Sequence, residues 1–191
     1  MRLRLASLSL LTWCVMLAAI PAAAQTIYNN GPINGNTDAR QINGGNGHGI
    51  VSDTFTLTAT STITSLEFAE WLTPGDTNAS VLAVVSSQPD GGTTFFSQTV
   101  NLTQSNCLLN EYGYDVCTSS GSVNWNLSAG TYWLNLQDAH VTGGNPAYWD
   151  ENSGIGCTSP GCPSSAQENG LGTIVRSVLS VVVARRLCPA P

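Results

Sequence analysis

The sequence predicts an all-β protein, a single-domain antiparallel β-sandwich that is jelly-roll-like, and three observations lead to this class. Apolar and polar residues alternate with a period of two over many short segments, as in strands that bury one face. Turn sequences rich in Gly and Pro separate these segments. No segment of helix length shows a 3.6-residue period. Many short strands with such turns are typical of two stacked sheets.

The clearest alternation covers residues 122–138 and continues on both sides of a Gly-containing break at 128–130. It predicts a β-hairpin whose two strands bury the same face. Such a hairpin is not stable alone in water, so the other strands are expected to supply a facing layer. Trp133 falls on the opposite, outward parity. The apolar positions of this segment are Val123, Trp125, Leu127, Tyr132, Leu134 and Leu136.

The other strands are expected between turns along the rest of the chain. Residues 29–49, dense in Gly and Asn, are expected to form a loop that contributes little to the core. Asp53 falls on the inward parity of its strand, so we expect that it lies near a strand end, that it binds a partner, or that the register differs; Glu70 shares one face of its strand with Leu66 and Phe68. The expected strands are 27–28, 50–58, 62–71, 80–85, 93–102, a hairpin closed by Cys107 and Cys117, 147–151 and a last strand beyond Gly172.

Residues 1–24 have the pattern of a secretory signal peptide. Arg2 and Arg4 precede an apolar stretch at 8–20, and a Pro-Ala-Ala-Ala cleavage site follows. The alternative is a transmembrane anchor, but the apolar stretch is short for a bilayer, which needs about 20 residues. Removing 24 of the 191 residues leaves 167, the size of a single domain. We therefore expect a secreted or cell-surface protein.

The mature chain is acidic and contains very few basic residues. It has no Lys. The span from Gln25 to Val175 contains all 12 Asp and Glu residues and one basic residue, Arg40, so its net charge is −11. Binding to phosphate groups depends on Lys and Arg. The composition therefore argues against nucleic acid and anionic membrane surfaces as partners.

Five of the six cysteines lie after the signal peptide. In an exported protein they are expected to form disulfides, and the short spacings favour Cys107–Cys117 and Cys157–Cys162. Zinc is the alternative, but no His lies near either pair. Cys188 is left without an expected partner.

The sequence offers no clear catalytic constellation, and we predict that the protein is not an enzyme. Neither His48 nor His140 accompanies a nucleophile-elbow sequence. Asp150 and Glu151 are adjacent and point apart in an extended strand, so they do not suit two-carboxylate hydrolysis of a glycoside. A glycoside hydrolase remains an alternative, with carboxylates from different strands.

Aromatic residues near strand ends suggest weak binding of a glycan, such as an extracellular polysaccharide or an envelope component. An exposed Trp beside amides and carboxylates offers a ring face for the sugar and hydrogen-bond partners for its hydroxyls. The alternatives are that each Trp packs against the second sheet, and that the protein is purely structural or adhesive. The predicted ligand-binding residues are Trp71, Trp133, Trp149, Asp150, Glu151 and Asn152.

A structural calcium ion is a further hypothesis, and no other cofactor is expected. Asp150, Glu151 and Asn152, together with Asp38 or Asp53, offer the hard oxygen ligands that Ca²⁺ takes. The alternative is a polar turn without a metal.

Three motifs resemble bacterial exported proteins that carry PEP-CTERM sorting signals. They are WLTPGD at 71–76, AGTYWLNLQ at 129–137 and YWDENSG at 148–154, and the resemblance covers most of 26–174. It implies a surface β-sandwich without assigned chemistry that is sorted at the envelope by an exosortase-type system.

The C-terminal segment departs from that family. The sandwich domain is expected over 25–174, and the tail at 175–191 has no Pro-Glu-Pro and no apolar run long enough to span a bilayer. Its longest apolar run is 181–184, followed by Arg185 and Arg186. The tail is either a last strand with a basic end or the product of an altered reading frame. In both cases no membrane span is expected in the mature chain.

Overall fold

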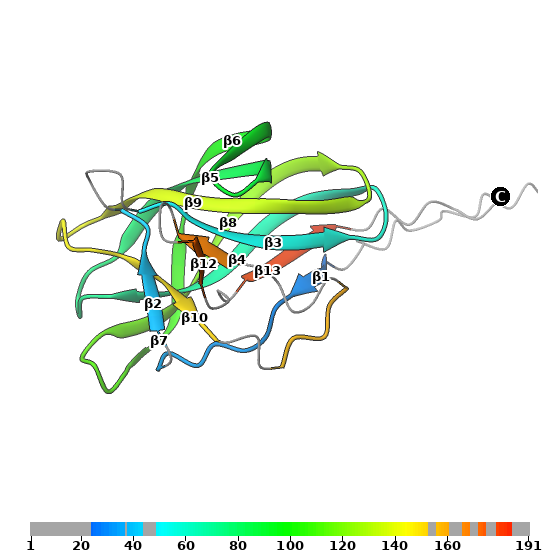
Figure 1. Cartoon of the computed structure of the whole chain (residues 1–191). Coiled ribbons are helices and arrows are strands. Elements are labelled where there is room, and N and C mark those ends of the chain that lie inside the picture. The colour runs from blue at the N-terminus through cyan, green and yellow to red at the C-terminus, as the bar shows by residue number, and fades with distance from the viewer. Residues whose placement is uncertain are drawn as a thin grey trace, which may run out of the picture.

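The computed structural model describes residues 24–36, 38–43, 49–152, 156–160, 166–168, 172–174 and 179–184. Every regular element in these residues is a β-strand, and the strands form two antiparallel sheets packed face to face (Figure 1). The predicted all-β sandwich is therefore confirmed. The expected signal peptide lies outside the described residues except for Ala24.

The first sheet, called sheet A, is built around β4. One side of β4 pairs with β8 along its whole length, and the other side pairs first with β13 and then with β10. β7 extends the sheet beyond β8, β1 extends it beyond β13, and β2 extends it beyond β10. The strands of sheet A are β1 (Ala24–Asn29), β2 (Asp38–Gln41), β4 (Ser61–Leu72), β7 (Thr103–Leu109), β8 (Asp115–Leu127), β10 (Tyr148–Glu151) and β13 (Leu179–Ala184).

The second sheet, called sheet B, has the strand order β12-β11-β3-β9-β5-β6. β5 and β6 form a hairpin through a turn at Pro89 and Asp90. Its strands are β3 (Val51–Leu57), β5 (Asn78–Gln88), β6 (Gly91–Asn101), β9 (Gly130–Val141), β11 (Ala166–Glu168) and β12 (Gly172–Ile174).

The chain crosses repeatedly from one sheet to the other. The order β1-β13-β4-β8 in sheet A faces β3-β9-β5-β6 in sheet B, which is the strand order of a jelly roll. β7 adds an edge strand to sheet A, and β2, β10, β11 and β12 extend the sandwich at its opposite side.

The core lies between the two sheets because each strand turns every second side chain inward. Phe68 and Trp125 of sheet A face Phe55 and Leu134 of sheet B, and all four are buried. Trp125 is 2% exposed, as its position on the apolar parity predicts.

The predicted hairpin at 122–138 is wrong. Its two halves are the end of β8 and most of β9, and these strands belong to different sheets: β8 pairs with β4 and β7, whereas β9 pairs with β3 and β5. Ser128 and Ala129 form an arch that carries the chain across the sandwich. The alternation of apolar and polar residues does not distinguish a hairpin from this arrangement. In a hairpin the apolar side chains of both strands lie on one side of a single sheet, whereas here they point toward each other from two sheets.

Several inward positions follow the predicted parity, and a β-bulge explains one that does not. Asp53 and Glu70 are both fully buried. Ile63 and Leu66 are three residues apart, so a regular strand would turn them to opposite faces. A register shift between Ile63 and Ser65 turns both side chains into the core.

Residues 29–49 contribute more than the expected loop. β2 lies in this segment and pairs with β10, and Ile42 directly after it is fully buried. Part of the C-terminal tail is also a strand: β13 lies between β1 and β4 in sheet A. Of the two interpretations of the tail, the strand at 179–184 corresponds to the one in which the tail forms a last strand.

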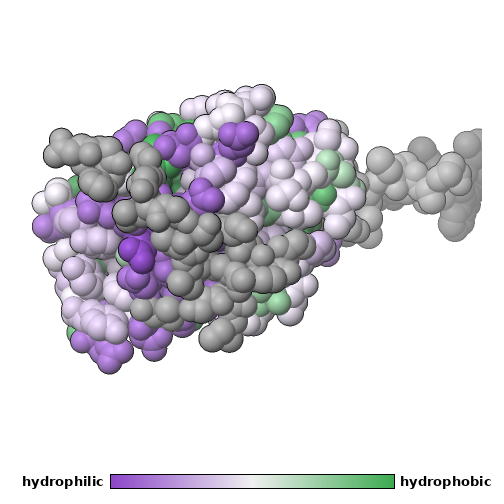
Figure 2. All heavy atoms as spheres, in the orientation of Figure 1, coloured by the Kyte–Doolittle hydropathy of each residue, from purple (hydrophilic) through white to green (hydrophobic). Residues whose placement is uncertain are grey.

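The described residues contain no helix with the length and apolar character needed to cross a membrane. On the face seen in Figure 2, the described surface is mostly neutral or hydrophilic, and hydrophobic residues form only small separate areas.

Gly121 in β8 marks the place where β6 packs against sheet A. A Cβ atom there would overlap with Cγ1 of Val100 and would lie 2.8 Å from the carbonyl oxygen of Asn101. We expect Gly121→Ala to lower the free energy of unfolding by about 2 kcal/mol, because overpacking a tight contact forces the neighbours apart. Chemical denaturation measures this change. Gly91→Ala is the matched control, since a Cβ atom at Gly91 meets only ordinary contacts and should leave the stability nearly unchanged.

Candidate functional site

A groove of about 660 Å³ lies on the outer side of sheet A, between residues 33–36 and the β7–β8 hairpin. Among the described residues that line it, Glu111 is the one carboxylate, and none carries a positive charge. The lining residues are Ile33, Asn34, Gly35, Asn36, Asn106, Leu108, Leu109, Asn110, Glu111, Val116 and Thr118.

Asn110 holds the two walls of the groove together. Its Nδ2 donates to the carbonyl oxygen of Gly35 at 2.9 Å, and its Oδ1 accepts from the backbone N–H groups of Tyr112 and Tyr114 at 3.0 and 2.9 Å. Gly35 has φ +64°, and a Cβ atom there would lie 2.9 Å from Cγ2 of Val116. The position therefore favours glycine, because the backbone is left-handed and lies close against β8.

A cluster of aromatic side chains lies beside the groove. Tyr112 stacks on Trp71 with ring centroids 5.6 Å apart and an interplanar angle of 16°. Tyr114 contacts Trp71 at 5.9 Å and Tyr148 at 5.7 Å. Trp71 is only 7% exposed, whereas Tyr112 remains 56% exposed. The second face of the Tyr112 ring is therefore accessible to a ligand.

Asp150 supports this wall from within. Its Oδ1 accepts a hydrogen bond from Nε1 of Trp71 at 2.6 Å, whereas its buried Oδ2 accepts none within the described part of the chain. Burial raises the pKa of Asp150 to about 6, and Trp71 and the nearby backbone N–H groups of Gly35 and Asn34 limit that rise. Asp150 thus connects the segment at 33–36 to β4 and β10.

A second group of carboxylates surrounds Arg40 between the two sheets. Nη2 of Arg40 lies 2.7 Å from Oδ2 of Asp38, and Nε lies 3.1 Å from Oε1 of Glu151. Nη1 lies 3.6 Å from Oε2 of Glu168, which belongs to β11 in sheet B. Arg40 therefore links an edge of sheet A to sheet B.

This cluster holds more carboxylates than Arg40 can neutralise. Burial raises the pKa of Glu151 to about 7, despite the opposing effect of Arg40. Burial by itself lowers the pKa of Arg40, but the charges of Glu151 and Asp38 outweigh that effect and raise it. Within the described part of the chain, Oε2 of Glu151 and Oε2 of Glu168 are buried and accept no hydrogen bond.

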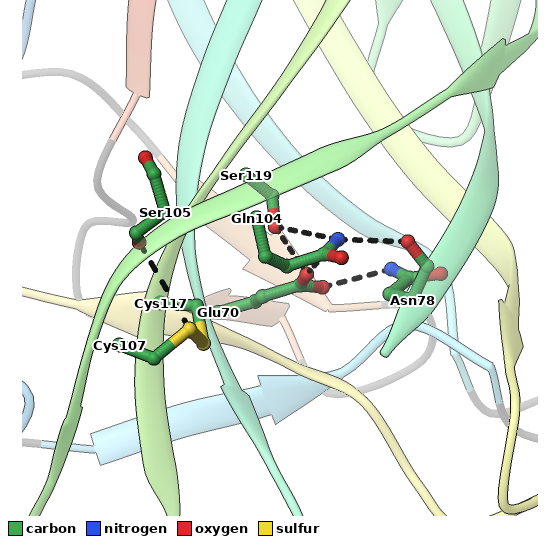
Figure 3. The surroundings of a disulfide bond; sticks show 7 residues. All are labelled: Glu70, Asn78, Gln104, Ser105, Cys107, Cys117 and Ser119. Atoms are coloured by element: carbon green, nitrogen blue, oxygen red, sulfur yellow. Dashed lines mark hydrogen bonds between the residues drawn. A yellow bond between two sulfur atoms is a disulfide. The ribbon is translucent and has the colours of Figure 1, made fainter. Parts of the chain in front are cut away.

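Glu70 forms a third buried polar group, near the disulfide (Figure 3). Oε2 of Glu70 accepts from Nδ2 of Asn78 at 2.8 Å, and Oε1 accepts from the Ser119 hydroxyl and from Nε2 of Gln104 at 3.2 Å. Burial raises the pKa of Glu70, although all three donors act in the opposite direction. The group joins β4, β5, β7 and β8 through neutral hydrogen-bond donors.

The three predicted tryptophans occupy three different environments. Trp149 was expected at the rim but is fully buried, because β10 is flanked by β2 and β4 and turns this ring toward Phe68. Trp71 is near the rim, but Tyr112 covers it. Trp133 is half-buried on the outer face of sheet B, which is the outward parity predicted for it.

The predicted acidic ligands do not converge. Asp150 turns toward Trp71 on the outer side, and Glu151 turns inward to Arg40. Nδ2 of Asn152 donates to the carbonyl oxygens of Asn30 and Pro32, both at 3.1 Å. These three side chains, which were predicted as glycan-binding residues and calcium ligands, are all buried.

The other suggested calcium ligands are also separated. Asp38 pairs with Arg40, whereas Oδ2 of Asp53 accepts from Nδ2 of Asn30 at 2.7 Å. In the described part of the chain no three His, Cys, Asp or Glu side chains are grouped so that they could hold a metal ion.

The predicted disulfide Cys107–Cys117 is confirmed, and it joins β7 to β8. Cys157 is also disulfide-bonded. Its predicted partner, Cys162, lies outside the described residues, as does Cys188.

The groove and its two most informative residues, Asn110 and Tyr112, were not predicted from the sequence. Both lie within the loop closed by Cys107 and Cys117, where an aromatic ring in a polar turn is the one sequence signal for the site. The opposite wall at 33–36 is distant in the sequence and gives no periodic signal.

Three comparisons with known proteins were made. A scan against protein-family models found no match, and searches of curated proteins and of solved structures found none either.

The raised pKa values of Asp150 and Glu151 predict that the protein loses stability as the pH rises. The folded state retains protons on these two carboxyl groups at pH values where the unfolded chain releases them. The resulting stabilisation is complete below pH values equal to the ordinary pKa values, 3.8 and 4.5, and it is lost as the pH rises through the raised pKa values of about 6 and about 7. We expect a melting temperature at about pH 5 that is higher by roughly 5 °C than at about pH 8. Glu151→Gln should reduce this difference, whereas Glu67→Gln, at an exposed position, should not. A melting temperature that rises with pH would contradict the assignment.

Replacing Arg40 tests the link between the sheets. Arg40→Ala leaves Asp38, Glu151 and Glu168 close together without a cation, so we expect the free energy of unfolding to fall by about 3 kcal/mol at neutral pH. Chemical denaturation at about pH 8 and about pH 5 measures the effect, which should be smaller at the lower pH because Glu151 is then protonated. An equal loss at both values would show that the charges do not cause it.

Proposed function

We propose that the protein is an exported, non-catalytic β-sandwich that binds a neutral glycan weakly in the groove on sheet A. The main support is the lining of that groove, which contains four asparagines, Thr118 and several aliphatic side chains. The exposed Tyr112 adjoins it, since its hydroxyl lies 3.5 Å from the carbonyl oxygen of the lining residue Asn36. Amides bind sugar hydroxyls, and an accessible ring face packs against the apolar face of a sugar.

The charge distribution favours a neutral ligand. Among the described lining residues no Arg or Lys is present, Glu111 is acidic, and the span from Gln25 to Val175 has a net charge of −11. Anionic polysaccharides would be repelled by this surface, because nothing in the groove offsets their charge.

Binding is favoured over hydrolysis by the positions of the carboxylates. Glycoside hydrolysis normally needs two carboxyl groups on either side of the scissile bond, and Glu111 is the one carboxylate among the described lining residues. Asp150 lies close by, but it is fully buried and its Oδ1 accepts a hydrogen bond from Nε1 of Trp71.

Export and envelope sorting belong to the same proposal. The signal-peptide pattern at 1–24, the Cys107–Cys117 disulfide and the resemblance to PEP-CTERM proteins support it. A purely structural or adhesive role is the alternative, and the high exposure of Leu108 and Leu109, 75% and 67%, favours it.

Tyr112→Ala tests the glycan proposal. We expect affinity electrophoresis to show retardation of the wild-type protein in soluble β-glucan or mannan and none in alginate. Loss of the exposed ring should weaken binding about tenfold, which corresponds to about 1.4 kcal/mol. Circular dichroism checks that the variant is folded.

Phe95→Ala is the control, since Phe95 is also an exposed aromatic residue, 44% exposed, but belongs to sheet B. It should bind as the wild type does. Binding that survives Tyr112→Ala, or that falls equally in both variants, would place the ligand elsewhere. Release of reducing sugar from the polysaccharide would favour the glycoside hydrolase alternative.

A further inference from the structure

β6 is an edge strand whose outer side pairs with no described strand. It ends sheet B, pairs with β5 alone among the described strands, and lies at the periphery of the molecule (Figure 1). An edge strand presents a row of N–H and C=O groups to which another strand can bond. Only Phe96 and Val100 of its eleven residues are not exposed.

The hydrogen-bond pattern identifies the residues that point outward. The N–H of Leu102 donates to the carbonyl oxygen of Ala79 at 3.0 Å, directly after the β5–β6 ladder. Bonded pairs alternate along an antiparallel ladder, and Val81 lies opposite Val100 in the same register. Val100, Gln98 and Phe96 therefore bond to β5, while Ser97 and Thr99 direct their N–H and C=O groups away from the sheet.

The inward side of β6 is firmly held, so its outer edge is a fixed template. Phe96 stacks on Trp125 with ring centroids 6.0 Å apart, and Oε1 of Gln98 accepts from Nε1 of Trp125 at 3.1 Å. Val100 is 1% exposed and packs where Gly121 has no side chain.

β6 lacks two common protections of an edge strand, and the register shifts in its pairing with β5 lie near the turn, between Val85 and Gln88. Natural edge strands are commonly blocked by Lys, by Pro or by inward charges. Residues 91–110, which include β6 and β7, contain no charged residue and no Pro. Ser97 and Thr99, whose backbone groups point outward, carry short hydroxyl side chains that permit a second strand to approach, and the exposed Phe95 precedes them.

We propose that two copies of the chain associate by pairing β6 with β6 in antiparallel orientation about a two-fold axis. Ser97 of one copy then lies opposite Thr99 of the other, with Gln98 at the axis. In this register the outward N–H and C=O groups of each copy face those of the other copy and can form hydrogen bonds with them. The occupant is a second copy because the edge has no charge that would select a partner of opposite sign. Two chains with a net charge of −11 over their cores also repel each other least along an uncharged strand.

Thr99→Pro tests the proposal, because proline removes an outward N–H group without breaking a bond to β5. Sedimentation velocity of the full chain, from micromolar to submillimolar concentration, should show a concentration-dependent dimer for the wild type and a monomer for Thr99→Pro. Thr99→Glu should also be monomeric, since it places two like charges across the axis. If circular dichroism shows that the proline variant is misfolded, Thr99→Glu decides.

Thr99→Val and Thr58→Glu are the matched controls. Valine keeps the backbone N–H, and Thr58 is an exposed residue directly after β3, a strand that β9 and β5 separate from β6, so it receives the same added charge away from the β6 edge. Both variants should remain dimeric. A monomeric wild type overturns the proposal, and so does a dimer that persists in Thr99→Pro and Thr99→Glu.

Discussion

The apolar layer between the two sheets is the constraint on which the rest of the structure depends. β4 and β8 from one side, and β3 and β9 from the other, each turn every second residue into this layer. Burial of these side chains is the main favourable term in folding. Because one side of each strand is used in this way, the opposite side of sheet A is free to carry the groove and its aromatic wall.

The protein buries several carboxyl groups but has very few basic side chains to pair with them. Glu70 and Asp150 are buried with neutral donors, and Glu151 shares Arg40 with Asp38 and Glu168. A buried carboxylate without full compensation favours its protonated form. The polar contacts that join the strands near the groove are therefore sensitive to pH, although none of them is the source of the fold.

The candidate site follows the usual division between scaffold and loops. The Cys107–Cys117 disulfide joins the strands whose connecting loop carries Asn110 and Tyr112, and Asn110 binds this loop to Gly35 on the other wall. Binding residues are commonly placed on loops that a rigid scaffold positions. The same sandwich exposes β6 on sheet B, so a ligand groove and an association edge can coexist on separate sheets.

The sequence by itself determined the strand-rich class and which way many side chains point. Trp125 and Trp133 take opposite parities as predicted, and Asp53 and Glu70 face inward, because a period of two is a local property of the backbone. Only the tertiary structure decided which strands are neighbours. It separated the two halves of 122–138 into different sheets, and it buried Trp149 by placing β10 between β2 and β4. It also brought residues 33–36 against the disulfide hairpin. These outcomes depend on contacts between residues far apart in the chain, and local periodicity carries no information about them.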